Sequence, residues 1–310
     1  MEFRHVSVLP DETIDRLITT TDGLYIDCTL GGAGHGLRIC QALGPGGRYV
    51  GIDRDPAALA AASEKLQTAK CRVDLVQANF AEIGQVADRL SITGVDGVLF
   101  DLGVSSHQLD TAERGFSYMQ DGPLDMRMNP ADPLAAADVV NQYSEQMLTK
   151  VIAEYGEERW AKRIAGFVAA ARREAPITTT SQLVDIIKRA VPAAVRRDGP
   201  HPAKRTFQAI RIEVNGELAI LRQALLDAIN LLRPGGRICV ITFHSLEDRI
   251  VKRTFSELTK SCTCPPSFPV CVCQTKPLLK LAGKAVCPSD QEVTDNPRAR
   301  SATLRVAEKR

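Results

Sequence analysis

The chain has 310 residues, of which 44% are hydrophobic and 25% are charged, and its formal net charge at pH 7 is +2. This length and composition allow a substantial core in one large domain or two ordinary ones, which excludes a disordered or fibrous chain. No apolar run approaches the length of a membrane span, and residues 1–10 carry charge where a secretory signal has an apolar stretch. We therefore expect a cytoplasmic protein that makes no contact with a membrane.

The small net charge conceals an uneven distribution along the chain. Residues 1–150 carry more acidic than basic side chains, whereas residues 151–205 and 250–310 carry more basic than acidic ones. The two basic segments could form one positive surface facing a phosphate backbone, the usual source of sequence-independent affinity for nucleic acid. Charge counting alone equally allows solvated helix faces.

The first predicted strand, Leu24–Ile26, ends at Asp27 and leads into a glycine-rich turn that runs to His35. The spacing of its glycines differs from the G-x-G-x-x-G loop of dinucleotide sites, and an acid before them would repel a pyrophosphate but attract an ammonium group. A second strand, Tyr49–Ile52, ends at Asp53, whose carboxylate can accept hydrogen bonds from both hydroxyls of a ribose. The pattern indicates a nucleoside cofactor with a cationic amino-acid tail, such as S-adenosylmethionine.

The third and fourth predicted strands end in groups that suit the same ligand. Val73–Val76 leads to Asn79 and Phe80, an amide and a ring that would suit an adenine at the carboxyl edge of the sheet. Val98–Phe100 runs into Asp101 and a polar loop, which is where such a fold places the group that meets the methyl acceptor. Asp101 is therefore the catalytic candidate.

Each of these signals has a structural alternative. A glycine-rich turn after a strand is common in α/β proteins, Asp53 could cap the alanine-rich helix that follows, and Phe80 alone is more often a core residue. Four strand ends that each carry a suitable group favour the functional interpretation.

The alternation of strands and helices stops after Asp101. Residues 103–130 show neither period, and an irregular segment of this length is usually functional. Residues 134–141, 144–154, 157–174 and 180–190 are predicted helices, with Ser144 and Thr180 as N-caps.

The sheet pattern then returns. We expect one long helix over 207–232, a turn at 234–236, a strand over 237–242 and a last strand over 302–307. The expected domains are 1–108 and 207–310, which together form the cofactor domain, and an inserted helical domain over 109–206.

The chain has nine cysteines and no export signal, which argues against a disulfide framework. Four of them form a C-x-C-x6-C-x-C cluster that could bring its sulfurs to one zinc ion or could consist of free or redox-active thiols. The cluster consists of Cys262, Cys264, Cys271 and Cys273. Four others lie in or beside apolar segments and are read as packing residues: Cys28, Cys40, Cys71 and Cys239.

With these segments in place, the chain resembles the RsmH (MraW) family of bacterial methyltransferases, which act on the N4 amine of a cytosine in the decoding region of small-subunit ribosomal RNA. The resemblance covers nearly the whole length. It rests on the following segments in chain order: His5 to Leu9, Asp27 to His35, Gly51 to Pro56, Asp101 to Gln108, Glu113 to Ser117, Gly122 to Met128, Tyr155 to Arg159, His201 to Ala203, Arg205 to Ala209, Phe243 to Arg249 and Asn296 to Ser301.

The resemblance implies a Rossmann-like class I methyltransferase sheet with an inserted all-helical domain. It also implies S-adenosylmethionine as cofactor and 16S ribosomal RNA or the small ribosomal subunit as partner; a homodimer is possible. The implied cofactor contacts are Ala33, Gly34, His35, Asp53, Phe80, Asp101 and Gln108. Ala33 stands where the family usually has glycine, so we expect little loss of binding unless this residue needs a positive φ. Zinc at the cysteine cluster is not implied.

Other roles follow from residue chemistry. His35 is expected to bind rather than to act as a base. His244 and Glu247 are either residues of a buried network or of a substrate loop, or helix caps. The helical insertion carries cations expected to contact phosphates flanking the target base: Arg159, Lys162, Arg163, Arg172, Arg173, Arg196, Arg197, Lys204 and Arg205. A methyltransferase for another RNA or for a small-molecule amine is the alternative, and a non-catalytic nucleic-acid-binding protein is a third class.

Overall fold

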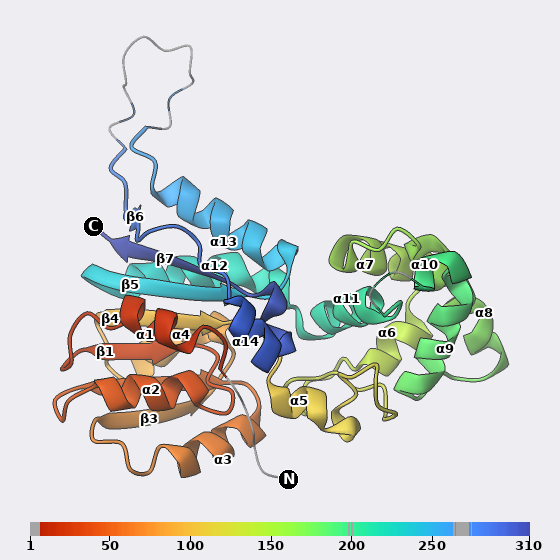
Figure 1. Cartoon of the computed structure of the whole chain (residues 1–310), viewed down its shortest axis with the longest axis horizontal. Helices are drawn as coiled ribbons and strands as arrows, with labels where there is room; N and C mark the ends of the chain where they lie inside the picture. Colours follow the sequence, from red (N-terminus) through yellow and green to blue (C-terminus); the bar gives the residue numbers. More distant parts are fainter. Residues whose placement is uncertain (1–6, 198, 200, 263, 265–272, 274) are drawn as a thin grey trace. The chain divides into compact units, whose positions relative to one another are not determined.

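The computed structural model describes residues 7–197, 199, 201–262, 264, 273 and 275–310 (Figure 1). The chain forms two compact units, one of Met1–Gly103 with Ile220–Arg310 and the other of Val104–Ala219. The second unit extends beyond residue 206 because Phe207, Ile210 and Val214 belong to its hydrophobic core. Within the described ranges, no helix is both long enough and apolar enough to span a membrane.

The first unit is built on a seven-stranded sheet with the order β3-β2-β1-β4-β5-β7-β6. The five strands from β3 to β5 run parallel, whereas β7 is antiparallel to both of its neighbours. This is the Rossmann-like sheet that the resemblance implies. The strands are β1 (Leu24–Asp27), β2 (Arg48–Asp53), β3 (Arg72–Gln77), β4 (Val95–Asp101), β5 (Leu232–Thr242), β6 (Leu279–Leu281) and β7 (Thr303–Lys309).

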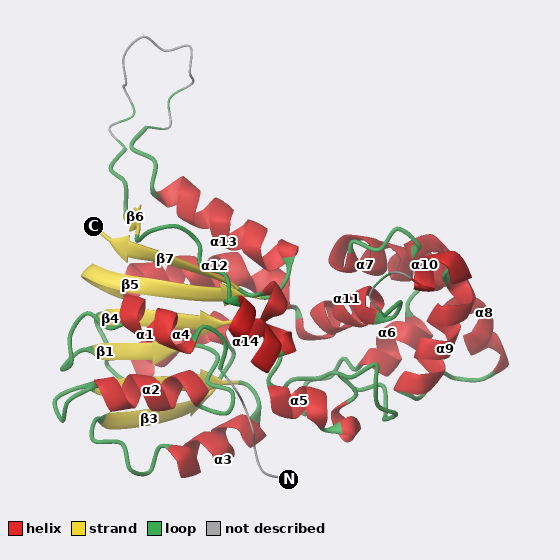
Figure 2. Cartoon of the chain, viewed as in Figure 1, coloured by secondary structure: helices red, strands yellow, loops and turns green. Residues whose placement is uncertain are grey.

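Helices cover both faces of the sheet (Figure 2), because successive strand residues point to opposite sides. Ile26 and Val50 belong to one buried core, whereas their neighbours Tyr25 and Tyr49 belong to the other. The helices of this unit are α1 (Pro10–Leu17), α2 (Gly34–Ala42), α3 (Pro56–Lys65), α4 (Ile83–Arg89), α12 (Glu217–Leu231), α13 (Ser245–Leu258) and α14 (Asp290–Asp295), with 3-10 turns η1 (Phe80–Glu82) and η3 (Pro297–Ser301).

The expectation of one helix over 207–232 is wrong. α11 (Lys204–Asn215) ends at Gly216, which has a φ of +61° and donates its N–H to the carbonyls of Ile212 and Glu213. α12 begins at the next residue. A glycine in the left-handed conformation ends a helix without the steric cost that a Cβ would bring. The expected turn at 234–236 lies inside β5, beside a register shift in its pairing with β4.

The second unit is helical and has its own core. Its elements are α5 (Ser106–Asp110), η2 (Ala112–Arg114), α6 (Ala136–Gln142), α7 (Glu145–Gly156), α8 (Ala161–Glu174), α9 (Thr180–Ala190), α10 (Ala193–Arg197) and α11. Ser144 caps α7 as expected, but α9 is capped by Thr179, which accepts from the N–H of Gln182. Thr180 instead donates its hydroxyl to the carbonyl of Gln120.

The segment over 103–130 is more ordered than its sequence suggests. It contains α5 and η2, and Arg114 donates to the carbonyls of Arg127 and Met128 at 2.8 Å each. The Asn215 amide accepts from the N–H of Met128 and donates to the carbonyl of Met126. These bonds fix an irregular backbone that has no periodic signal in the sequence.

Candidate active site

Three aspartates lie at the carboxyl ends of neighbouring parallel strands. Asp27 ends β1, Asp53 ends β2 and Asp101 ends β4. Parallel strands in register present these ends at one edge of the sheet, where the strand arrowheads lie (Figure 1). This edge is where open α/β sheets bind ligands.

Asp27 is buried and held by three hydrogen bonds. Its carboxylate accepts from the Thr29 N–H at 3.1 Å, from the Thr29 hydroxyl at 3.5 Å and from the Tyr49 hydroxyl at 3.0 Å. Burial raises the pKa of Asp27 to about 6, and the charge of Asp53 adds to the shift. The free site therefore carries a desolvated acid that a cationic ligand would stabilise.

Asp53 ties two turns together. One carboxylate oxygen accepts from the Gly31 N–H in the glycine loop and the other from the Asp55 N–H, each at 2.8 Å. Asp55, not Asp53, caps α3 by accepting from the Ala57 N–H at 3.0 Å. Burial raises the pKa of Asp53 to about 6. A carboxylate has about four acceptor positions, and the backbone N–H of Arg54 also donates to this one, so the position that remains can accept from a ribose hydroxyl.

Asp101 is the third buried acid at this edge. Burial, with the nearby charges of Asp27 and Glu247, raises the pKa of Asp101 well above its ordinary value. Its Oδ2 lies 3.6 Å from Nε2 of His35, and its Oδ1 has no hydrogen-bond partner among the described residues. A buried acceptor left in this state costs free energy, which a donor on a ligand would recover.

The glycine loop is held from outside by side chains that the sequence analysis did not single out. Lys65 at the end of α3 donates to the carbonyl of Gly32 at 2.9 Å. Thr29 links two strand ends, because its hydroxyl accepts from the Asp101 N–H at 2.6 Å. The sequence signal for Thr29 is its place directly after the Asp27 turn, whereas Lys65 shows no local signal.

Ala33 has the positive φ at which an alanine is less favourable than the glycine usual in the family. It is fully buried at the start of α2, with a φ of +53° in the left-handed region. Alanine adopts this conformation at a cost of about 1 kcal/mol or more, which glycine avoids. Gly34 and His35 follow as the first residues of α2, and the His35 side chain is buried.

The residues after β3 have mainly local roles. The Asn79 side chain accepts from the Ala81 N–H, and the backbone N–H of Asn79 donates to the Glu82 carboxylate, forming a capping box at η1. Asn79 is thus committed to its own backbone. Phe80 is half-buried and packs edge-to-face on Phe100, with ring centroids 5.9 Å apart. It lines this edge of the core, where an adenine contact stays a prediction.

His244 and Glu247 form the N-terminal cap of α13. Glu247 accepts from the N–H groups of Phe243 and His244, and the His244 ring accepts from the Glu247 N–H at 3.4 Å. The two side chains also lie 3.1 Å apart. Of the two roles left open for these residues, the structure supports capping, although the Glu247 charge also acts on Asp101.

Gln108 lies in the other unit, so its predicted cofactor contact stays a prediction. It is buried, its side chain accepts from the Ser105 N–H and its own N–H donates to the Ser105 hydroxyl. This capping box starts α5.

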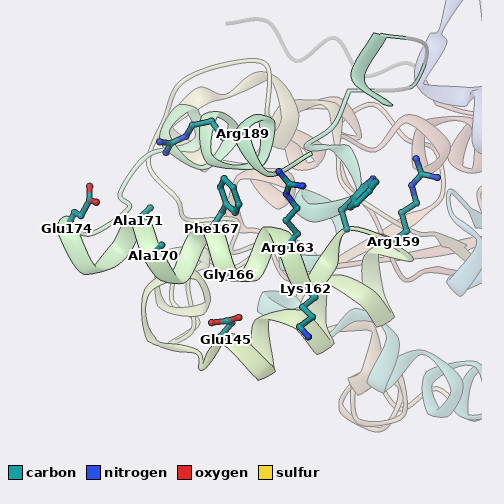
Figure 3. Close-up of a pocket in the computed structure, with 11 residues that line it drawn as sticks. Glu145, Arg159, Lys162, Arg163, Gly166, Phe167, Ala170, Ala171, Glu174 and Arg189 are labelled. Carbon is teal, nitrogen blue, oxygen red and sulfur yellow. The ribbon is translucent and has the colours of Figure 1, made fainter. Parts of the chain in front are cut away.

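The helical unit has a cationic pocket of its own with a volume of about 780 Å³. Figure 3 shows Arg163 and Phe167 pointing from α8 toward Arg189 on α9. The guanidinium of Arg163 lies 5.5 Å from the Phe167 ring, and that of Arg159 lies 5.3 Å from the Trp160 ring. The lining is mixed, since Glu145 and Glu174 also contribute. Cations beside exposed ring faces can bind phosphates and stack on bases.

Arg172 does not line this pocket. It donates to the carbonyls of Val140 at 2.6 Å and Tyr143 at 2.5 Å and so holds the end of α6 against α8. Arg205 likewise donates to the carbonyl of Glu157. Arg172 and Arg205, both expected to contact phosphates, thus donate to backbone carbonyls of their own unit.

Comparisons with known proteins show the family of the chain. The model of the MraW methylase family matches residues 2–310. The ribosomal RNA small subunit methyltransferase H of Symbiobacterium thermophilum is 56% identical over 310 residues, covering 100% of this chain and 98% of that protein. The proteins of the same name from Ruminiclostridium cellulolyticum and Clostridioides difficile are 55% and 53% identical, each over 100% of both chains. The chain belongs to the MraW methylase family.

Proposed function

We propose that this protein transfers a methyl group from S-adenosylmethionine to the N4 amine of a cytosine in the decoding region of 16S ribosomal RNA. The observation that carries the proposal is the set of buried carboxyl groups at the ligand-binding edge of a class I methyltransferase sheet. Family membership supplies the reaction type and the cofactor. Because the substrate is ribosomal, we place the protein in the cytoplasm.

The residues at the edge fit this cofactor. S-adenosylmethionine supplies an electrophilic methyl on a sulfonium, and its tail ends in an ammonium group. Asp27 would attract the ammonium group, and Asp53 would accept from the ribose with the acceptor position that its three backbone donors leave. Ala33, Gly34 and His35 would line the cofactor through the glycine loop.

Asp101 is the residue we assign to the acceptor amine. The exocyclic amine of cytosine is a poor nucleophile because its lone pair is delocalised into the ring, so orientation is the main task. The unpartnered Oδ1 of Asp101 would accept a hydrogen of this amine and favour a pyramidal nitrogen. Alignment of this kind can contribute roughly 7 kcal/mol or more to catalysis.

The helical unit would hold the RNA around the target base. Arg159, Arg163 and Arg189 gather beside two aromatic rings in one pocket, which suits phosphates and unpaired bases. The target base must leave its stack to reach a methyl held at the sheet edge.

The test is the transfer of labelled methyl groups to small ribosomal subunits that lack the modification, followed by nucleoside analysis. N4-methylcytidine in the digest is the expected product. Transfer to free cytidine at a comparable rate would favour a small-molecule methyltransferase instead. Cofactor binding without transfer to either substrate would point to another RNA, and failure to bind the cofactor would contradict the proposal as a whole.

A further inference from the structure

Three cysteine sulfurs converge at the segment that follows α13. The thiol atoms of Cys262, Cys264 and Cys273 all lie within 4.8 Å of one another. The Cys262 and Cys273 sulfurs are 3.8 Å apart. Residues 11 positions apart in the chain thus bring their sulfurs together, in a segment that the methyl-transfer site does not use.

The spacing fits coordination of one metal ion. Zinc binds thiolates at about 2.3 Å in a tetrahedron, and such a tetrahedron has sulfur–sulfur edges of about 3.8 Å. A disulfide would instead place the two sulfurs about 2.05 Å apart. The Cys262–Cys273 separation of 3.8 Å therefore matches a tetrahedral edge, not a covalent bond.

The local backbone also favours the thiolate form. The Cys264 N–H points at the Cys262 sulfur, with a separation of 3.4 Å. A donor to a thiolate stabilises its charge and orients it as a ligand. Leu258 at the end of α13 and Leu278 before β6 lie side by side, since the Leu278 N–H donates to the carbonyl of Leu258 at 2.9 Å.

The remaining cysteines differ from this cluster in their surroundings. Cys28, Cys40 and Cys239 are buried in the core of the first unit, and burial raises the pKa of each thiol, that of Cys239 to about 12. Protonated thiols are poor metal ligands. Cys287 is exposed and does not belong to the cluster, which makes it a matched control.

We propose that Cys262, Cys264 and Cys273 bind a structural zinc ion. Three soft thiolate ligands without a carboxylate select zinc over magnesium or calcium. A fourth thiol is close in the sequence at Cys271, which lies outside the described residues, and the proposal stands on the three described ligands. The ion would clip the chain between α13 and β6, a role independent of methyl transfer.

The first experiment measures zinc and iron by mass spectrometry in the full chain, purified without chelators under reducing conditions. We expect about one zinc per chain in the wild type and in Cys287→Ser. In Cys273→Ser and in the double variant Cys262→Ser/Cys264→Ser, zinc affinity should fall by more than the roughly 10–100-fold seen when an outer-shell partner of a metal site is lost.

A second measurement does not require a variant to fold. Cobalt added to the metal-free wild type should produce the charge-transfer and visible bands of a tetrahedral thiolate site. Trypsin cleavage after the exposed Lys260, which is followed by Ser261, should be slower with zinc than with a chelator. A wild type that binds no zinc after reconstitution would overturn the proposal, as would full zinc retention in a variant that lacks all three cysteines or iron in place of zinc.

Discussion

The buried acids at the sheet edge make the affinity for S-adenosylmethionine depend on pH. Burial raises the pKa values of Asp27 and Asp53 to about 6 in the unliganded protein. The ammonium group and the ribose hydroxyls of the cofactor bind to the ionised forms of Asp27 and Asp53. Below pH 6, binding of the cofactor must therefore displace a proton from each aspartate. The ligand's own ammonium and carboxyl groups titrate outside the range from pH 5 to 7.

The size of the effect follows from these pKa values. For one carboxyl with a pKa of about 6, lowering the pH from 7 to 5 weakens binding about tenfold, or about 1.4 kcal/mol. With both Asp27 and Asp53, we expect the affinity for S-adenosylmethionine to fall by about 100-fold over this pH range.

The stability of the unliganded protein should change in the opposite direction. A carboxyl whose pKa is raised by folding contributes stability that is fully present below its unfolded pKa of about 3.8 and is lost as the pH rises through about 6. These two aspartates therefore stabilise the free fold at pH 5 relative to pH 7, while the cofactor binds less tightly.

Isothermal titration calorimetry at several pH values and in buffers of different ionisation enthalpy measures both affinity and proton release. We expect release of nearly one proton per carboxyl at pH 5. Asp53→Asn should bind S-adenosylmethionine more weakly than the wild type at pH 7. Its loss of affinity between pH 7 and pH 5 should be about tenfold smaller than that of the wild type. An affinity that does not change over this range, or an unchanged dependence in Asp53→Asn, would refute the reasoning.

Three further predictions concern other parts of the molecule. Gly36→Ala places a Cβ 2.9 Å from Cζ of the buried Tyr49 ring, so urea denaturation should show a loss of about 1–3 kcal/mol, and unchanged stability would contradict the packing. Asp101→Ala, which removes the acceptor oxygen, should lower the single-turnover rate at saturating cofactor by about 100-fold or more, and a normal rate in a folded variant would remove Asp101 from the mechanism. Arg163→Ala/Arg189→Ala should weaken RNA binding and reduce the slope of log K against log salt by about 2, whereas an unchanged slope would show that the pocket contacts no phosphates.

The strand ends could be predicted from the sequence because each combines an apolar run with a polar residue directly after it. Asp27, Asp53 and Asp101 all lie where this pattern places them. The same local pattern cannot show what a side chain bonds to. Asn79 and His244 use their polar atoms to cap the elements they precede, and these bonds form only once the backbone has its final conformation.

Other features depend on contacts between distant residues. Gly216 sits within a continuous helical pattern, and a single glycine there costs only about 1 kcal/mol, so the sequence does not decide whether the helix continues. Asn215 orders the segment around Met126 across more than 80 residues of chain. The left-handed backbone of Ala33 likewise follows from packing, since alanine has no intrinsic preference for it.

Trp160 is the only tryptophan in the chain, and it lines the cationic pocket of the helical unit. Its indole is half-buried beside the guanidinium of Arg159. Light at the long-wavelength edge of protein absorption excites tryptophan selectively, so the intrinsic fluorescence of the protein reports on this one pocket without a label. A change in this emission on adding RNA would report binding at that pocket. A series of oligonucleotides could therefore be compared by their affinity before any methylation assay.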